Sequence, residues 1–180
     1  MSLRVIEVVS YRPEWPAMFE QEAAELRRAL GDVARHVHHI GSTSVPGLAA
    51  KPIIDILLEV TTLESLDALN PPMLALGYEP RGEFGIPRRR YFPKGGADRT
   101  HQVHAFAAGD EHVIRHLAFR DYLRAHSETA KEYGQLKMAI ARECDNDIER
   151  YCDGKDAYVK AIEARALAAF TGLDRHQTLL

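Results

Sequence analysis

The residues best suited to bind a ligand form a turn of small side chains at positions 41–44. Gly41 is followed by three hydroxyl residues, Ser42, Thr43 and Ser44, and the turn comes after an extended, histidine-rich stretch at 34–40. Glycine can adopt positive φ and lets a backbone approach a ligand closely, and the hydroxyl and N–H groups of such a turn can bind phosphate oxygens. The turn therefore predicts a site for a small phosphorylated ligand or nucleotide.

An isolated carboxylate follows the turn. Asp55 interrupts the apolar run 52–60, which is typical of a central strand covered on both faces. A buried carboxylate is costly unless a cation or hydrogen-bond donors pair with it, so Asp55 is either ion-paired or a metal ligand. Because side chains alternate along a strand, Asp55, Leu57 and Glu59 share one face. We expect Asp55 and Glu59 to hold a divalent metal, Mg²⁺ or Mn²⁺, against a triphosphate.

Three common motifs do not fit the turn. Gly41 and Gly47 are separated by five residues, and no Lys-Ser or Lys-Thr pair follows, which excludes a P-loop. Val45 occupies the position that a G-x-S-x-G nucleophile turn gives to its last glycine. The third glycine of a dinucleotide fingerprint is missing as well. The turn is therefore a phosphate-binding candidate of another kind.

Longer motifs resemble one family along most of the chain. They are IGSTSVPGLAAKPIID at 40–55, THQVH at 100–104, FRDYLR at 119–124, YGQLK at 133–137, and YCDGK at 151–155 with Tyr158-Val159. Together they resemble the GrpB family over roughly residues 5–170. The Gly-Ser turn before an acidic strand resembles the wider DNA polymerase beta-like nucleotidyltransferase superfamily, where that pair opens the active site. The resemblance implies a nucleotidyltransferase-like fold and relatives fused to dephospho-coenzyme A kinases.

Acidic residues are fewer than this resemblance implies. Active members of the superfamily carry acid-x-acid on the first strand and a third acid on a later one, whereas Leu57 occupies the second position here. Glu59 lies two residues further along, about 6–7 Å up the strand. The later strand offers His101 and His104 and no carboxylate, and histidine binds Mn²⁺ or Zn²⁺ better than Mg²⁺. We assign His104 to a metal or to proton transfer; the alternative is a buried histidine bonded to backbone.

Basic residues from three segments could complete the phosphate site. Lys51 belongs to the GrpB-like motif beside the turn, and Arg90 ends a run of three arginines at 88–90. Arg120 and Arg124 are four residues apart on one helix face, and guanidinium groups suit bidentate phosphate contacts. The alternatives are an edge strand protected by charge for the arginine run, and a surface lattice of salt bridges for Arg120 and Arg124.

Composition limits the class of partner. At 180 residues and 46% hydrophobic, the chain is long enough for one well-buried α/β domain. A net charge of −3 gives no positive field for general nucleic-acid binding and favours a small phosphorylated ligand. Cys144 and Cys152 have no paired spacing, and neither a signal peptide nor a long apolar span is present. We expect a reduced, cytoplasmic protein that does not enter a membrane.

Hydrophobic periodicity predicts alternating strands and helices, then helices alone. Strands are expected at 4–9, 34–40, 52–60, 88–94 and 101–107, and helices at 13–30, 62–76, 111–126, 128–143 and 146–170. Pro71-Pro72 should break or restart the second helix, Ser127 should cap the fourth, and the tail from Thr171 should fray. We expect one α/β (α+β) domain over residues 1–180. A mixed, nucleotidyltransferase-like sheet flanked by helices should span about 1–109, and a C-terminal helical extension about 110–170.

The sequence leaves three functions open. In the first, the Ser42 turn holds a nucleoside triphosphate, Asp55 with Glu59 and His104 holds a metal, and a nucleotidyl group passes to an unidentified acceptor. In the second, a catalytically degenerate domain binds a nucleotide or a coenzyme A-related ligand, which Leu57 and the missing third acid favour. In the third, the chain is an assembly or chaperone-like module, and its long C-terminal helices could also form a homo-oligomer.

Overall fold

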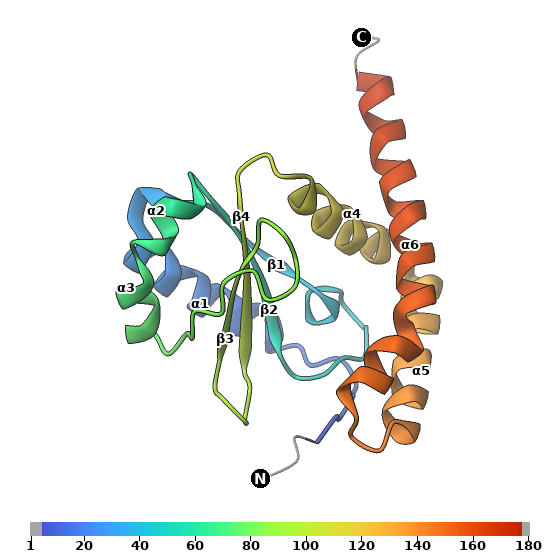
Figure 1. Cartoon of the computed structure of the whole chain (residues 1–180). Coiled ribbons are helices and arrows are strands. Elements are labelled where there is room, and N and C mark those ends of the chain that lie inside the picture. Colours follow the sequence, from blue (N-terminus) through green and yellow to red (C-terminus); the bar gives the residue numbers. More distant parts are fainter. Residues whose placement is uncertain (1–4, 178–180) are drawn as a thin grey trace.

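A four-stranded mixed sheet organises the computed structural model, which describes the backbone of residues 5–177 and the side chains of residues 5–172 (Figure 1). The elements in chain order are α1 (Trp15–Leu30), η1 (Gly31–Val33), β1 (Ala34–Ile40), η2 (Ser42–Ser44), β2 (Ile54–Val60), α2 (Leu63–Asp67), α3 (Asn70–Ala75), β3 (Arg90–Lys94), β4 (His101–Ala107), α4 (Glu111–Ala125), α5 (Ser127–Glu143) and α6 (Ile148–Gln177). None of the helices within residues 5–177 is long and apolar enough to cross a membrane. The expected α/β fold with a C-terminal helical extension is confirmed.

The strand order is β1-β2-β4-β3, so the strand that carries Asp55 lies inside the sheet. β2 pairs antiparallel with β1 and parallel with β4, and β3 closes the other edge antiparallel to β4. The register sets Asp55 beside Ile40 on one neighbouring strand and beside Gln102 on the other. The parallel pairing of β2 with β4 brings residues 101–107 next to the acidic strand.

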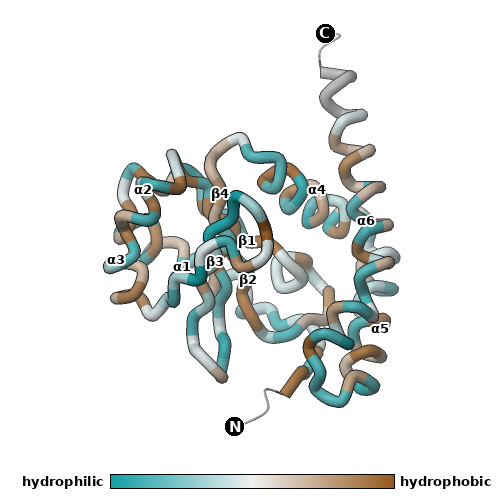
Figure 2. Tube along the Cα trace, in the orientation of Figure 1, coloured by the Kyte–Doolittle hydropathy of each residue, from teal (hydrophilic) through white to brown (hydrophobic). Residues whose placement is uncertain are grey.

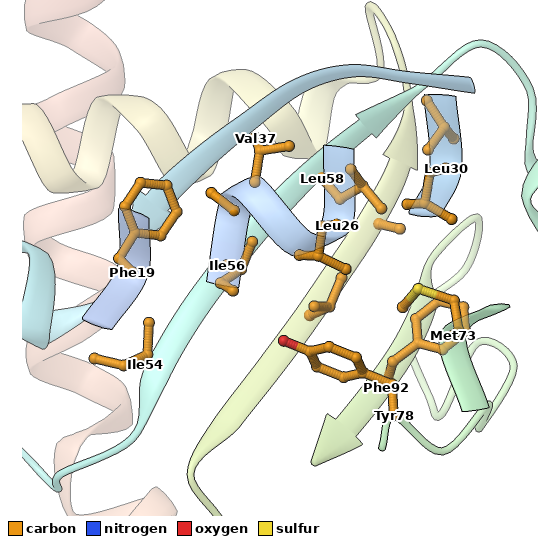
Figure 3. Close-up of a cluster of buried hydrophobic side chains, with 14 of the residues drawn as sticks. Phe19, Leu26, Leu30, Val37, Ile54, Ile56, Leu58, Met73, Tyr78 and Phe92 are labelled. Atoms are coloured by element: carbon orange, nitrogen blue, oxygen red, sulfur yellow. The ribbon is translucent and has the colours of Figure 1, made fainter. Parts of the chain in front are cut away.

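One face of the sheet packs on α1, α2 and α3 (Figure 1). Even-numbered residues of β2, from Ile54 to Val60, point to this side and join Phe19 and Leu26 of α1 in the main core. Figure 3 shows this cluster between α1 and the sheet, with Met73 of α3 at its edge. The aliphatic run of β2 thus fixes which face carries Asp55, because alternate side chains point to opposite faces.

The other face of the sheet packs on α4, with α5 and α6 beyond it (Figure 1). Ile40, Leu57, Phe106 and Val113 form a small core between the sheet and α4. In Figure 2, hydrophilic and hydrophobic residues alternate along α5 and α6, as expected for helices with one buried side. Because Leu57 is fully buried in this core, Asp55 lies where the face opens beyond it, toward α5 and α6.

The arrangement differs from the expected elements at several boundaries. The strand expected at 4–9 is wrong, because Val9 alone has a bridge partner, Ala50; Arg4 lies outside the described residues. β2 begins at Ile54, two residues after the expected start. β3 begins at Arg90, because Arg88 turns to φ 64° and its N–H donates to Glu83.

The helices also differ in detail. The expected restart is confirmed, since α2 and α3 are separate and the proline pair lies in the first turn of α3. Ser127 is wrong as a cap: it is the first residue of α5, and His126 holds the cap position. The fraying expected from Thr171 is wrong for residues 171–177, because α6 continues to Gln177. Residues 178–180 lie outside the described part of the chain.

Candidate functional site

A cavity of about 420 Å³ opens beside the turn 41–43 and the start of β2. Its other walls come from Phe84 in the loop before β3, from Tyr91 and Gln102 of the sheet, and from α5 and the first turns of α6. The cavity volume falls in the range of about 300–1,000 Å³ common for small-molecule sites. Residues far apart in the sequence therefore meet around the predicted phosphate turn.

Gly41 and Asp55 lie in direct contact at the cavity wall. Gly41 has φ 71°, and a Cβ added there would lie 2.7 Å from Asp55 Oδ2. Any side chain would therefore meet both a strained backbone and the carboxylate. The requirement for glycine follows from the close approach of Asp55, which the register of β1 and β2 sets opposite Ile40.

Two of the three hydroxyl groups in the turn bond to residues of the turn and of β1, and the third bonds to a side chain of the C-terminal helices. Ser44 Oγ donates to the carbonyl of Gly41, and Thr43 Oγ1 lies 2.9 Å from His39 Nε2. Burial lowers the pKa of His39 to about 4, so the imidazole is neutral at neutral pH. Thr43 and Ser44 thus shape the turn with their hydroxyls. The hydroxyl of Ser42 instead meets a side chain from the C-terminal helices.

That side chain is Lys137 of α5. Its Nζ donates to Ser42 Oγ at 2.6 Å and to the carbonyl of Ala49, and it lies 4.5 Å from the centre of the Tyr133 ring. Only 3% of the residue is exposed. Burial, with the nearby charges of Lys155 and Lys51, lowers the pKa of Lys137 to about 7. Lys137 belongs to the YGQLK motif, but its charge alone did not mark it as a site residue.

Four basic side chains line the cavity: Lys51, Arg99, Lys137 and Lys155. Lys51 and Lys155 lie 5.0 and 5.5 Å from the centre of the Tyr151 ring. Among the described residues that line the cavity, Asp55 is the only acid. The cavity is thus strongly basic in a chain whose net charge is −3. Of these four, only Lys51 was expected; Arg99, Lys137 and Lys155 reach the cavity through packing.

Asp55 is supported from the sheet by a chain of side chains. His104 Nε2 lies 3.2 Å from Asp55 Oδ1, and His104 Nδ1 lies 3.4 Å from the guanidinium of Arg89. A guanidinium only donates, so a hydrogen bond from Arg89 requires Nδ1 of a neutral imidazole as acceptor and places the ring proton on Nε2, facing Asp55. Both ring nitrogens are then engaged. His104 thus contacts the carboxylate on one side and Arg89 on the other, and its expected role at a metal or in proton transfer stays a prediction.

Arg89 also fixes the loop that carries Phe84. Its Nε and Nη2 donate to the carbonyls of Glu83 and Phe84, at 3.1 and 2.7 Å. Phe84 is 63% exposed and its ring stacks on Tyr91 with centroids 5.1 Å apart. The same arginine therefore holds Asp55 through His104 and places an aromatic side chain at the cavity rim.

Glu59 does not join Asp55 at the cavity. Its Oε1 lies 2.6 Å from His38 Nε2, and the residue is 9% exposed. Among the described residues, no group of three histidine, cysteine, aspartate or glutamate side chains could hold a metal ion. The side chains present therefore do not fit a resident metal: Asp55 alone offers a carboxylate, and His104 is already bonded to it.

The three expected arginines lie outside the cavity wall. Arg90 makes a paired contact with Asp67 of α2, at 2.7 and 2.9 Å, because its parity on β3 is that of the core residue Phe92. Arg120 donates to the carbonyl of His39, and Arg124 donates to that of Ser44. These two arginines bind backbone carbonyls just before the turn and at its last residue, on the side away from the cavity. They position it and do not reach the cavity that Ser42 faces.

The fold defines a mixed α/β protein whose sheet is completed on one face by C-terminal helices, with a basic cavity between them. A family model described as GrpB protein matches residues 5–165. The chain belongs to the GrpB family.

Individual relatives agree with this assignment. The chain is 46% identical to the UPF0157 protein YqkA of Bacillus subtilis over 91% of its own length and 48% of that protein. It matches the crystal structure of conserved protein GrpB from Enterococcus faecalis with a TM-score of 0.88 and 45% identity, covering 91% of this chain and 99% of that one. It is also 29% identical to a dephospho-CoA kinase of Mycolicibacterium paratuberculosis, over 89% of this chain and 46% of that protein. The chain spans about half the length of these two curated relatives.

Proposed function

We propose that the cavity binds a nucleotide or a closely related phosphorylated ligand. The observation that carries this proposal is the bond between Lys137 and Ser42, which sets a buried amine against the hydroxyl of a glycine turn. Lys51, Arg99 and Lys155 line the same cavity. Clustered cations with one opposing acid repel one another, and a bound polyanion relieves that repulsion.

The turn and Lys137 would act together on the phosphate. In its protonated form, the amine of Lys137 offers three donors, of which Ser42 and Ala49 take two. A phosphate oxygen could accept the third, or replace Ser42 and free its hydroxyl to donate to the ligand. The backbone of the turn is already fixed by Arg120 and Arg124. The site is thus preorganised, which reduces the entropy lost on binding.

The aromatic rim favours a nucleotide over inorganic phosphate. Phe84 and Tyr91 stack with their planes 20° apart, and both line the cavity. The ring of Phe84 is 63% exposed and can stack on a nucleobase, which is worth about 1–3 kcal/mol per base, whereas Tyr91 is only 6% exposed and supports the ring of Phe84. The dephospho-CoA kinase among the relatives adds coenzyme A-related nucleotides to the ligands worth testing.

Binding of the wild-type protein should be measured with ATP, GTP, CTP, UTP and coenzyme A, each with Mg²⁺ and with Mn²⁺, by isothermal titration calorimetry. A divalent ion would enter with the ligand's phosphates, since Asp55 is the one carboxylate available. We expect saturable binding of at least one nucleotide. If none of the five binds under either condition, the proposal fails.

A second candidate, transfer of a nucleotidyl group to an acceptor, is favoured by the position of Asp55 against Gly41. This is the pairing of turn and acid that the nucleotidyltransferase resemblance implies. Pyrophosphate release should be compared in wild type and Asp55→Asn, with Asp32→Asn, an exposed aspartate outside the cavity, as control. Release that only Asp55→Asn abolishes would establish transfer; absence of release in wild type with every acceptor would leave binding alone.

A further inference from the structure

A second cavity of about 340 Å³ adjoins the first. The two have four wall residues in common: Lys51, Ile53, Arg99 and Ile148. The second cavity extends from these toward the N-terminal segment and the turn between β3 and β4. A ligand could thus pass from one compartment to the other alongside two cations.

The walls of the second cavity suit an uncharged, partly apolar group. Val5 and Ile6 line it from the N-terminal segment, and Ile148 lines it from the first turn of α6. Its own charged residues are acids, Glu7 and Asp98. Carboxylates repel a further phosphate but accept hydrogen bonds from amide or hydroxyl donors. This compartment therefore favours a different chemical group from the basic one.

Arg99 lines both compartments and has a donor nitrogen that makes no hydrogen bond within the described residues. One of its terminal nitrogens donates to the hydroxyl of Tyr91 at 3.2 Å. Its Nε is buried, with no hydrogen-bond partner in the part of the chain that the structure describes. A buried donor without an acceptor is unfavourable. A turn of the side chain toward a phosphate oxygen would satisfy Nε without breaking an existing bond of that atom.

We propose that the natural ligand is a nucleoside diphosphate conjugate. The nucleoside and the phosphates of this ligand occupy the first cavity, and the last phosphate lies beside Lys51 and Arg99. The second group of the ligand, an extended uncharged arm with amide or hydroxyl donors, fills the second cavity. This inference rests on the proposed nucleotide binding and adds the chemical class of the ligand's other half.

The test compares ADP with dephospho-coenzyme A, in which the same ADP unit carries an uncharged pantetheine arm. Affinities should be measured by calorimetry for wild type and for Ala97→Trp. Ala97 is exposed and lines only the second cavity, so the indole would fill that compartment and leave the first unchanged. Ala108→Trp is the matched control, because Ala108 is also exposed in a turn and lines neither cavity.

Wild type should bind dephospho-coenzyme A at least tenfold more tightly than ADP. Ala97→Trp should remove that difference with ADP affinity unchanged, and Ala108→Trp should preserve it. Equal affinity of wild type for the two ligands, or a difference that survives Ala97→Trp, overturns the inference while nucleotide binding stands. Failure of both ligands to bind any of the three proteins would instead remove the proposed function on which the inference rests.

Discussion

Lys137 Nζ lies 2.6 Å from Ser42 Oγ, and this hydrogen bond joins two residues that are 95 positions apart. Ser42 belongs to the turn after β1, and Lys137 lies in the middle of α5. Gly134, one turn earlier on α5, lets this helix pack closely against the segment that carries Leu48, because a Cβ at Gly134 would lie only 3.3 Å from the Leu48 side chain. The C-terminal helices therefore complete the cavity that the sheet begins.

Ligand binding should take up a proton at pH 8. Burial lowers the pKa of Lys137 to about 7, so its amine is mostly neutral at that pH. A phosphate beside it favours the charged form and raises the pKa again. Calorimetric titration with ADP in two buffers of different ionisation enthalpy measures the uptake. Wild type should gain a fraction of a proton and Lys137→Met should gain none; equal uptake by both would assign the proton to another group.

The stability of the protein should depend on pH through the same amine. The folded-state pKa of Lys137, about 7, lies below the ordinary value of 10.5 for a lysine, so the unfolded chain binds the extra proton between these values. The free energy of unfolding therefore rises with pH in this window, by up to about 1.4 kcal/mol per pH unit, and the contribution is constant below pH 7.

Urea denaturation of wild type and Lys137→Met at pH 7, 8, 9 and 10 measures this contribution. The stability of wild type should rise relative to that of the variant as pH increases. A difference that stays constant over the four pH values would contradict the lowered pKa.

Gly41→Ala should destabilise the fold more than an equally strained substitution elsewhere. The new Cβ would meet Asp55 Oδ2 at 2.7 Å, in addition to the cost of a positive φ. Gly109→Ala is the control, because Gly109 has φ 85° and nothing within 4 Å of the added atom. Chemical denaturation should show a loss of about 1–3 kcal/mol for the control and more for Gly41→Ala. Equal losses would mean that Asp55 moves aside freely.

The tautomer of His104 gives an independent view of Asp55. Because Arg89 can only donate, the proton of His104 should reside on Nε2, facing Asp55. Nitrogen-15 NMR of labelled protein should show a protonated Nε2 and an unprotonated Nδ1. Arg89→Met removes the donor and should let the tautomers mix. A proton fixed on Nδ1 in wild type would show that Asp55 is supported in another way.

The sequence predicted those site features that depend on neighbouring residues in the chain. A glycine before three hydroxyl residues marked the turn, and a single acid in an aliphatic strand marked Asp55. The elements with strong periodicity, α1, β1, β4 and the C-terminal helices, were confirmed for the same reason, since each pattern is local.

Side chains that reach the cavity through tertiary packing were not predicted. Arg99 follows a turn, and Lys137 and Lys155 lie on helices, where a lysine is normally exposed. Arg90 was expected at the site but lies elsewhere. Strand alternation divides side chains between two faces without telling which face carries the site, and Arg90 lies on the face that meets Asp67. Arg120 and Arg124 do share a helix face, but that face meets the backbone of the turn.

The contribution of Lys137 to nucleotide affinity tests the central claim most directly. ADP binding should be measured by calorimetry for wild type, Lys137→Met and Lys131→Met. Lys131 is the matched control, an exposed lysine on the same helix that does not line the cavity. Methionine fills the space of Lys137 without the cost of a buried amine, so the variant should fold. We expect Lys137→Met to weaken ADP binding at least tenfold and Lys131→Met to leave it unchanged; equal affinities for all three proteins would contradict a phosphate site at Ser42 and Lys137.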